Sequence, residues 1–225
     1  PNERGPRRLS FWERGLAGNY FCIDSNAVFV RDFYRTDFMA KPGIPFTFLT
    51  EDRALQVKPT YYQETWINRQ KSLERIREAI NYQGPWLLTV HGHAVFSAKV
   101  LSSFKSDFLQ PKGWDYRDAL AVAPYEPTWY NTWLLHSQVI EVIAREPIVK
   151  TFHNSTQHLD YLLQGVTNED LARGYIAVVV NSNYSRGNGV ISINTSPRQL
   201  LAAYVGFPDL FRALFKRFKI SVFQN

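Results

Sequence analysis

The sequence predicts an α/β fold with a mixed sheet flanked by helices, and three features predict it. Residues 20–33 form an apolar run rich in β-forming side chains, as expected of a strand buried on both faces beneath helices. Residues 175–181 contain the run Ile176-Ala177-Val178-Val179-Val180 and are a second candidate of the same kind. Helical and strand patterns alternate between the two runs, which is typical of an α/β domain.

The remaining elements follow from local patterns. Residues 62–82 form the clearest helix, because Trp66, Leu73, Ile76 and Ile80 share one face, and Gly84-Pro85 is expected to end it. Residues 114–123 fit neither pattern clearly. The other predictions are helices at 9–16, 98–104, 128–143 and 159–164, and strands at 45–49, 86–90 and 148–152.

Composition limits the functional classes. The chain has 225 residues, 45% of them hydrophobic, which suits one ordinary domain with a sizeable core. The net charge of +6 favours anionic partners, namely phosphorylated small molecules, acidic membrane surfaces or nucleic acid. No nucleic-acid motif accompanies this charge, so we do not expect a nucleic-acid partner. The oligomeric state is left open.

Cysteine content and hydropathy bear on the compartment. Cys22 is the only cysteine, which excludes an internal disulfide and a cysteine-based zinc cluster. No apolar run reaches membrane-spanning length and no signal peptide is visible. These features predict a cytoplasmic protein.

The predicted boundary divides the chain into a domain at 1–196 and a helical extension at 197–225. The extension carries an apolar stripe with basic residues around it, formed by Phe211, Leu214, Phe215 and Phe218 together with Arg212, Lys216, Arg217 and Lys219. Two interpretations of the extension are equally favoured. It could be a helix that contacts a membrane surface peripherally, or a helix that packs on the core.

Asp24-Ser25-Asn26 interrupts the first apolar run and is the first candidate site. A carboxylate near a buried strand is costly to desolvate, so it is normally paired, hydrogen-bonded or bound to a cation. Side chains two residues apart in an extended segment point the same way, so Asp24 and Asn26 could bind one Mn or Mg ion. The same spacing is also frequent in ordinary turns.

Three segments together carry a family resemblance. The strand followed by Asp24-Ser25-Asn26 and Val28-Phe29-Val30-Arg31-Asp32-Phe33 resembles the donor-site motif of GT-A glycosyltransferases, in particular uncharacterised glycosyltransferase-like families of bacteria and large viruses. Residues 86–104, with His91-Gly92-His93, and residues 124–130 resemble later motifs of those families. The resemblance covers roughly residues 8–181.

The resemblance implies transfer of a sugar from a nucleotide-diphosphate donor to a glycan acceptor during polysaccharide biosynthesis. It implies that Arg8, Asp24 and Asn26 bind the nucleotide sugar, and that Asp24, Asn26 and His153 hold Mn or Mg. That metal would neutralise charge on the leaving diphosphate.

Glu126 is the predicted catalytic acid-base residue, because an inverting transfer needs a carboxylate near the acceptor hydroxyl, whereas a retaining enzyme would use it to position the acceptor. His91, His93, Trp129 and Tyr130 are the predicted acceptor-binding residues. Each has a structural alternative: Glu126 before Pro127 suits the first turn of a helix, and the aromatic residues suit a core.

Two departures from the family pattern keep a second class open. Asn26 stands where the motif commonly has Asp, which removes a charge from the metal site. Only 23 residues precede Asp24, fewer than one βαβ unit of about 30 residues, so part of the nucleotide-binding half is expected to be missing. The alternative function is a non-catalytic, GT-A-like carbohydrate-binding or structural module, from a fragment or a degenerate relative.

Overall fold

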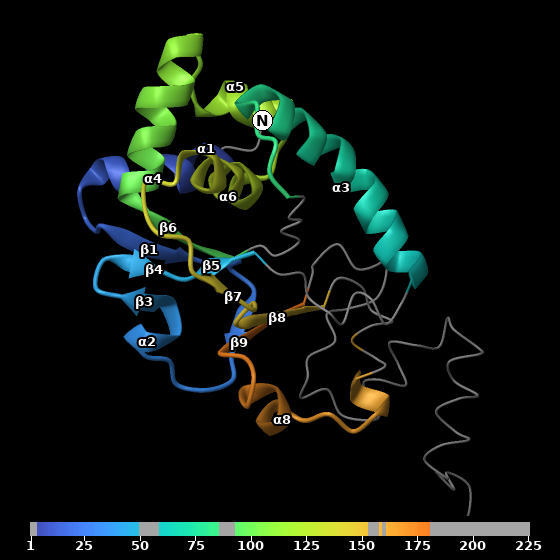
Figure 1. Cartoon of the computed structure of the whole chain (residues 1–225). Helices are drawn as coiled ribbons and strands as arrows, with labels where there is room; N and C mark the ends of the chain where they lie inside the picture. The colour runs from blue at the N-terminus through green and yellow to red at the C-terminus, as the bar shows by residue number, and fades with distance from the viewer. Residues whose placement is uncertain (1–3, 50–58, 86–92, 153–157, 159–160, 181–225) are drawn as a thin grey trace, which may run out of the picture. The chain divides into compact units, whose positions relative to one another are not determined.

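The computed structural model describes residues 4–49, 59–85, 93–152, 158 and 161–180 (Figure 1). The chain divides into two compact units. The first contains Pro1–Ser25 and Phe33–Ile148, and the second contains Asn26–Asp32 and Val149–Asn225. The boundary between them therefore falls inside the Asp24-Ser25-Asn26 triplet.

Three two-stranded pairings occur among the described residues of the first unit. β1 (Asn19–Cys22) runs antiparallel to β6 (Ala94–Ser97), with Tyr20 opposite Phe96. β3 (Met39–Lys41) pairs with β4 (Ile44–Pro45) across a turn in which Gly43 has φ 78°, a left-handed conformation that favours glycine. β5 (Thr47–Phe48) pairs in parallel with β7 (Ala144–Arg145).

Helices make up most of the first unit, and Figure 1 shows α1, α4 and α6 on one side of the β1–β6 pair. Helix α4 passes directly into a π-helical segment, η3, and η3 into η4. The helices are α1 (Arg4–Ser10), η1 (Phe11–Arg14), α2 (Arg35–Phe38), α3 (Pro59–Ile80), α4 (Ala98–Ser103), η3 (Phe104–Leu109), η4 (Gln110–Lys112), α5 (Tyr116–Val122) and α6 (Glu126–Ser137).

An aromatic cluster forms the centre of the first unit's core. The Phe104 and Phe108 rings stack at 5.3 Å, and each lies within 6 Å of the Trp129 and Trp133 rings. Trp129 is completely buried, so its replacement by Ala would cost about 3–5 kcal/mol of stability. This core anchors the helices against which the candidate site is built.

The second unit has a three-stranded sheet in the order β2-β9-β8. β2 (Ala27–Phe29) is antiparallel to β9 (Ala177–Val180), whereas β8 (Val149–Phe152) is parallel to β9. Helix α8 (Asn168–Ala172) follows a capping box in which the Thr167 hydroxyl accepts from the Asp170 amide. Its Leu171 packs with Phe152 and Val178 in this unit's core.

The predicted α/β class is confirmed, and the sheets contain strands of both orientations. The prediction of a single buried strand at 20–33 is wrong. The run divides into β1 and β2, which belong to different sheets. The reason is local, because Ser25 and Asn26 adopt a turn that ends the extended segment. Val28 and Phe29 are 64% and 48% exposed, so β2 is not buried on both faces.

Most other element predictions are confirmed, with shifted ends. The helix expected at 62–82 is α3, and it ends at Ile80, because the next residue, Asn81, adopts a left-handed conformation before Gly84 is reached. The helix expected at 128–143 stops at Ser137, where Gln138 has φ 50°. The ambiguous segment at 114–123 contains helix α5.

Three further predicted elements have counterparts in the structure, and two predicted segments lie outside the described residues. The strands expected at 148–152 and 175–181 are β8 and β9, and the short helix expected at 98–104 is α4 extended by η3. The strand expected at 86–90 and the extension at 197–225 lie outside the described residues. Among the described helices, none combines the length and apolarity needed to cross a membrane.

Candidate functional site

An ion pair joins the helix at the start of the chain to the loop after β1. Arg8 Nη2 lies 2.9 Å from Asp24 Oδ1, and the two side chains are 26% and 40% exposed. A charged hydrogen bond of this length is stronger than a neutral one. Two residues predicted from separate parts of the sequence are therefore in direct contact.

Local packing positions this ion pair. Leu9, next to Arg8, is completely buried in the core and holds α1 in place. The Tyr20 hydroxyl donates a 2.7 Å hydrogen bond to the Arg8 carbonyl oxygen, which ties α1 to β1. Burial raises the pKa of Tyr20, so the hydroxyl remains a donor at neutral pH. These contacts fix the backbone on the Arg8 side of the pair.

Glu126 and Cys22 share the electrostatic environment of the ion pair. Burial lowers the pKa of Arg8, but the hydrogen bond to Asp24 and the charges of Glu126 and Asp24 outweigh it, so the pKa is raised. Burial raises the pKa of the Cys22 thiol, with Arg8 opposing this shift and Glu126 adding to it. We call Arg8, Cys22, Asp24 and Glu126 the Arg8 cluster.

The charges of the Arg8 cluster do not cancel. The Arg8 guanidinium is hydrogen-bonded to Asp24 and interacts electrostatically with Glu126, and the raised pKa keeps the Cys22 thiol neutral at pH 7. Glu126 is the first residue of α6 and is half-buried, a position favoured by the helix dipole. The cluster therefore has a net negative charge, which suits a cation or a hydroxyl donor as a further ligand.

Asn26 belongs to the second unit, whereas Asp24 belongs to the first. Its Nδ2 donates a 2.5 Å hydrogen bond to the carbonyl oxygen of Val180 at the end of β9. Each member of the predicted metal-binding pair thus has a partner within its own unit. Joint binding of one ion by Asp24 and Asn26 stays a prediction.

A divalent ion fits part of this residue set. Within the described residues, the carboxylate of Asp24 has one hydrogen-bonded partner, Arg8, so its other oxygen keeps capacity for a hard cation. Among those same residues, no three His, Cys, Asp or Glu side chains form a complete metal-binding group. His153, the third predicted ligand, lies outside the described residues.

The aromatic residues predicted to bind the acceptor lie in the core. Trp129 is fully buried and its Nε1 donates to the Ala123 carbonyl oxygen at 2.9 Å. Tyr130 is 2% exposed, and its hydroxyl accepts from the Ser97 amide at 3.0 Å. Their burial corrects the prediction that these rings stack on a sugar, because a stacking platform needs an exposed face.

The two histidines predicted beside them are placed differently. His93 is 1% exposed, and its ring centroid lies 5.2 Å from that of Phe48 and 6.2 Å from that of Phe21. This burial among aromatic rings also removes His93 from the acceptor-binding set. His91 lies outside the described residues.

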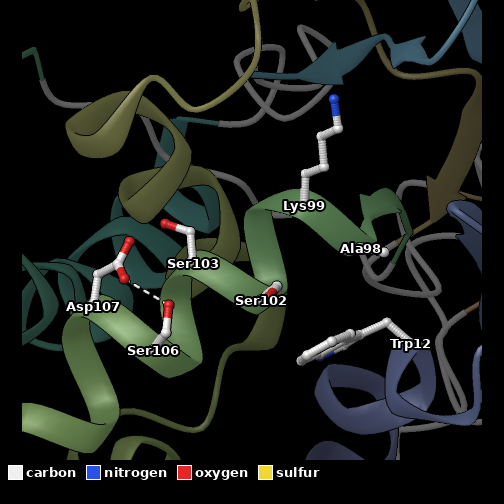
Figure 2. Close-up of a pocket in the computed structure, with 7 residues that line it drawn as sticks. All are labelled: Trp12, Ala98, Lys99, Ser102, Ser103, Ser106 and Asp107. Carbon is white, nitrogen blue, oxygen red and sulfur yellow. Dashed lines mark hydrogen bonds between the residues drawn. The ribbon is translucent and has the colours of Figure 1, made fainter.

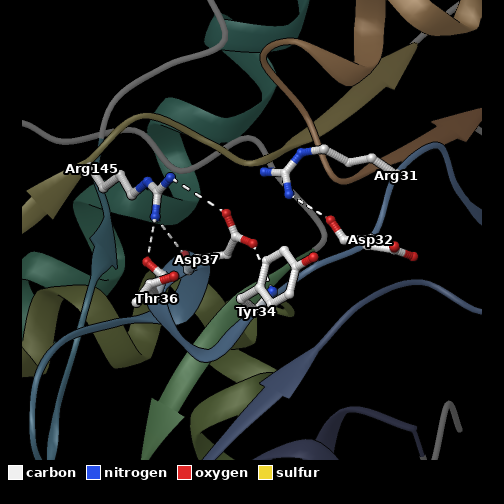
Figure 3. Close-up of polar contacts among 6 residues, drawn as sticks. All are labelled: Arg31, Asp32, Tyr34, Thr36, Asp37 and Arg145. Atoms are coloured by element: carbon white, nitrogen blue, oxygen red, sulfur yellow. Dashed lines mark hydrogen bonds and ion pairs between the residues drawn. The ribbon is translucent and has the colours of Figure 1, made fainter.

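The first unit contains a second acid–arginine pair, which the sequence did not predict (Figure 3). Asp37 is 8% exposed, and its Oδ2 accepts from the Tyr34 amide at 2.9 Å. Arg145 Nη1 donates to the carbonyl oxygens of Asp37 and Thr36, at 2.7 and 3.3 Å. These bonds cap α2 and hold it to β7, so the pair is structural. The available sequence signal was an acid three residues after Tyr34, which can accept the Tyr34 amide hydrogen bond at the start of a helix.

The same figure includes a contact from the second unit. Arg31 Nη1 donates a 2.6 Å hydrogen bond to the carbonyl oxygen of Asp32, the next residue along the chain. Both residues belong to the segment that resembles the end of the donor-site motif. This local bond shapes the backbone after β2 and gives no indication of a ligand.

A pocket of about 450 Å³ also lies in the first unit (Figure 2). Its lining comes from η1 and from the continuous helix formed by α4 and η3. The lining residues are Trp12, Ala98, Lys99, Ser102, Ser103, Ser106 and Asp107. None of them was among the predicted site residues.

Comparison with known proteins assigns the chain to no family. No family model matches this sequence, and no curated protein matches it.

Proposed function

We propose that this protein is a metal-assisted glycosyltransferase that moves a sugar from a nucleotide-diphosphate donor to a glycan acceptor. One observation carries the proposal: Asp24 contacts Arg8, and the charge of Glu126 also acts on Arg8. Positions 8, 24 and 126 come from three separate segments of the sequence, each with its own role in the resemblance to GT-A enzymes. The proposal includes a GT-A-like arrangement of the donor site.

Each residue has a chemical role that its position permits. Arg8 offers a permanent positive charge and several N–H donors, which suit the oxygens of a diphosphate. Glu126 would accept the proton of the acceptor hydroxyl as that oxygen attacks the sugar carbon. Asp24 would hold Arg8 in position and direct its other oxygen to the donor ribose or to a bound cation.

The net charge of the cluster supports the requirement for a cation. A nucleotide diphosphate is itself anionic, so two carboxylates and one arginine alone would repel it. A divalent ion held by Asp24 and Asn26 would neutralise the leaving diphosphate when bound. Arg8 would then exchange part of its interaction with Asp24 for a phosphate oxygen.

Calorimetric titration tests this proposal. The full chain would be titrated with UDP-glucose, UDP-galactose and GDP-mannose, with and without MnCl₂. We expect binding that depends on Mn and is weakened at least tenfold in Asp24→Ala and Arg8→Gln. Glu141→Gln, which breaks the exposed Lys41–Glu141 ion pair, is the matched control and should bind as the parent does.

Catalysis must be measured separately from donor binding. With a bound donor, Glu126→Gln should retain nucleotide-sugar affinity and lose release of the nucleoside diphosphate to a glycan acceptor. Absence of donor binding in the parent chain would overturn the enzyme proposal.

A non-catalytic carbohydrate-binding module is the second candidate. It is favoured by the hydrogen bonds that already engage Asp24 with Arg8 and Asn26 with Val180. In such a module the cluster would stabilise the β1 loop. Glycan binding without nucleotide-sugar binding would identify this alternative.

A further inference from the structure

The pocket beside Trp12 combines an aromatic wall with a polar wall (Figure 2). Trp12 is half-buried, and its Nε1 donates to the Tyr116 hydroxyl at 3.0 Å. This bond fixes the edge of the indole, so the ring is held rigidly at the pocket. An aromatic ring held in this way is suited to stack on an apolar ligand face.

The helix opposite Trp12 supplies the polar wall. Ser102 and Ser106 are four residues apart, as are Ser103 and Asp107, so their side chains lie on neighbouring rows of one helix surface. Ser102, Ser106 and Asp107 are exposed. The segment from Phe104 onward is π-helical, a form that occurs frequently at functional sites.

Internal hydrogen bonds orient these polar groups. The Ser106 hydroxyl donates to Asp107 Oδ1 at 2.5 Å. Trp133 Nε1 donates to Ser103 Oγ at 3.0 Å, which leaves the Ser103 hydroxyl hydrogen available as a donor. Preorganised donors and acceptors reduce the ordering cost of binding a ligand.

Charge narrows the class of ligand. The Asp107 carboxylate in the lining disfavours a phosphate, and among the described residues no three His, Cys, Asp or Glu side chains are grouped to hold a metal ion, so a neutral ligand is favoured. In Figure 2 the Lys99 side chain extends away from Trp12. The pocket is an open depression of about 450 Å³, so a bound ligand would keep part of its surface in solvent.

We propose that this pocket binds one pyranose unit of a neutral glycan, with Trp12 stacked on the apolar face of the sugar. Asp107, Ser102 and Ser106 would bind its hydroxyls. The inference that this glycan is the acceptor rests on the proposed transferase function, whereas sugar binding itself does not.

The pocket would hold a unit remote from the reacting one. Ala98 and Lys99 follow β6 at its Ser97 end, which pairs with Asn19 at the start of β1. Asp24 follows the opposite end of β1, and a four-residue strand spans about 10 Å. Binding of remote substrate units is a common means of positioning the reacting group. The pocket therefore predicts a preference for oligosaccharides over single sugars.

Saturation-transfer NMR with the full chain tests this inference. The probes are methyl glucoside, methyl mannoside, cellotriose, maltotriose and mannotriose. We expect at least one trisaccharide to bind, and binding to weaken at least tenfold in Asp107→Asn and in Ser102→Trp, which fills the pocket. Both substituted positions are exposed, so the variants should fold. Glu78→Gln on the exposed face of α3 is the matched control.

The outcomes separate the two proposals. Binding by no probe, or equal binding by the parent and both pocket variants, would overturn the pocket assignment. Trisaccharide binding lost in Asp107→Asn, in a protein that binds no nucleotide sugar, would support the pocket and reject the transferase. Asp107→Asn should leave nucleotide-sugar affinity unchanged, because Asp107 lies outside the Arg8 cluster.

Discussion

Asp24 and Asp37 are both paired with an arginine in the first unit, yet their surroundings differ. The Asp37 side chain is 12% exposed and binds the Tyr34 amide as well as lying 3.9 Å from Arg145 Nη2. The Asp24 side chain is 40% exposed and, within the described residues, bonds to Arg8 alone. Asp37 is thus committed to holding α2, whereas Asp24 retains capacity for a ligand. An acid–arginine pair therefore indicates a binding site only when the carboxylate can still accept a ligand.

Substitution of Asp37 gives the largest expected effect. Asp37→Ala removes the helix cap and leaves Arg145 without its carboxylate, which should cost about 2–4 kcal/mol of unfolding free energy. Asp24→Ala should cost no more than about 1 kcal/mol, because exposed ion pairs contribute little. Urea denaturation of the two variants measures the contrast. Equal losses would contradict the distinction between a structural and a ligand-binding acid.

Substitution of Arg8 should affect binding more than stability. Arg8→Gln keeps a hydrogen-bond donor but removes the charge, so Mn-dependent nucleotide-sugar affinity should fall at least tenfold, which corresponds to a loss of about 1.4 kcal/mol or more. Arg145→Gln is the matched variant at the other pair and should leave affinity unchanged. Calorimetric titration of both variants with nucleotide sugar and Mn, at equal salt concentration, measures the two affinities. Equal affinities would show that Arg8 contributes no more to binding than Arg145 does.

An added carboxylate at position 26 sharpens the test of the metal site. Asn26→Asp introduces a second acid near Asp24 in sequence, and Mn affinity should rise about threefold if both bind one ion. The change also removes the hydrogen bond to the Val180 carbonyl, which should cost about 1 kcal/mol of stability. Manganese titration followed by electron paramagnetic resonance measures the affinity. Unchanged Mn binding would place the metal elsewhere or remove it from the proposal.

The smallest expected effect is a change in the rate at which the Cys22 thiol is alkylated in Arg8→Gln. Burial raises the thiol pKa and Arg8 opposes that shift, so Arg8→Gln should raise the pKa further and reduce the thiolate fraction at pH 8. Iodoacetamide labelling of this single cysteine should slow about two- to threefold in the variant. Labelling should accelerate as pH rises towards the pKa in both proteins. Lys41→Gln controls for a general loss of positive charge.

Sequence periodicity predicted elements that depend on local pattern. The spacing of Leu73, Ile76 and Ile80 predicted α3, and all three side chains are buried. Apolar runs predicted β8 and β9 because a short β-branched run between turn residues has few alternatives. The ends of the helices were less predictable, since Asn81 and Gln138 adopt left-handed conformations without glycine at either position.

A site residue could be predicted where the chemistry of its side chain requires a partner. It could not be predicted where its role depends on whether the side chain is buried. An acid interrupting an apolar run requires a partner, which pointed to Asp24, and basic Arg8 supplies that partner. Trp129 and Tyr130 have side chains that suit either a sugar site or a core. Only packing against Phe104 and Phe96 placed them in the core, because aromatic type alone does not reveal which faces neighbours cover.

The sequence by itself determined the α/β class, most of the helices and strands, and the residues with unusual chemical requirements. Tertiary structure decided that residues 20–33 supply strands to two different sheets, and that Arg8, Cys22, Asp24 and Glu126 share one environment. It also placed Trp12 opposite the serines of α4 and η3. The physical reason is that periodicity records which face of an element is apolar, whereas contacts between distant segments depend on how those faces pack together.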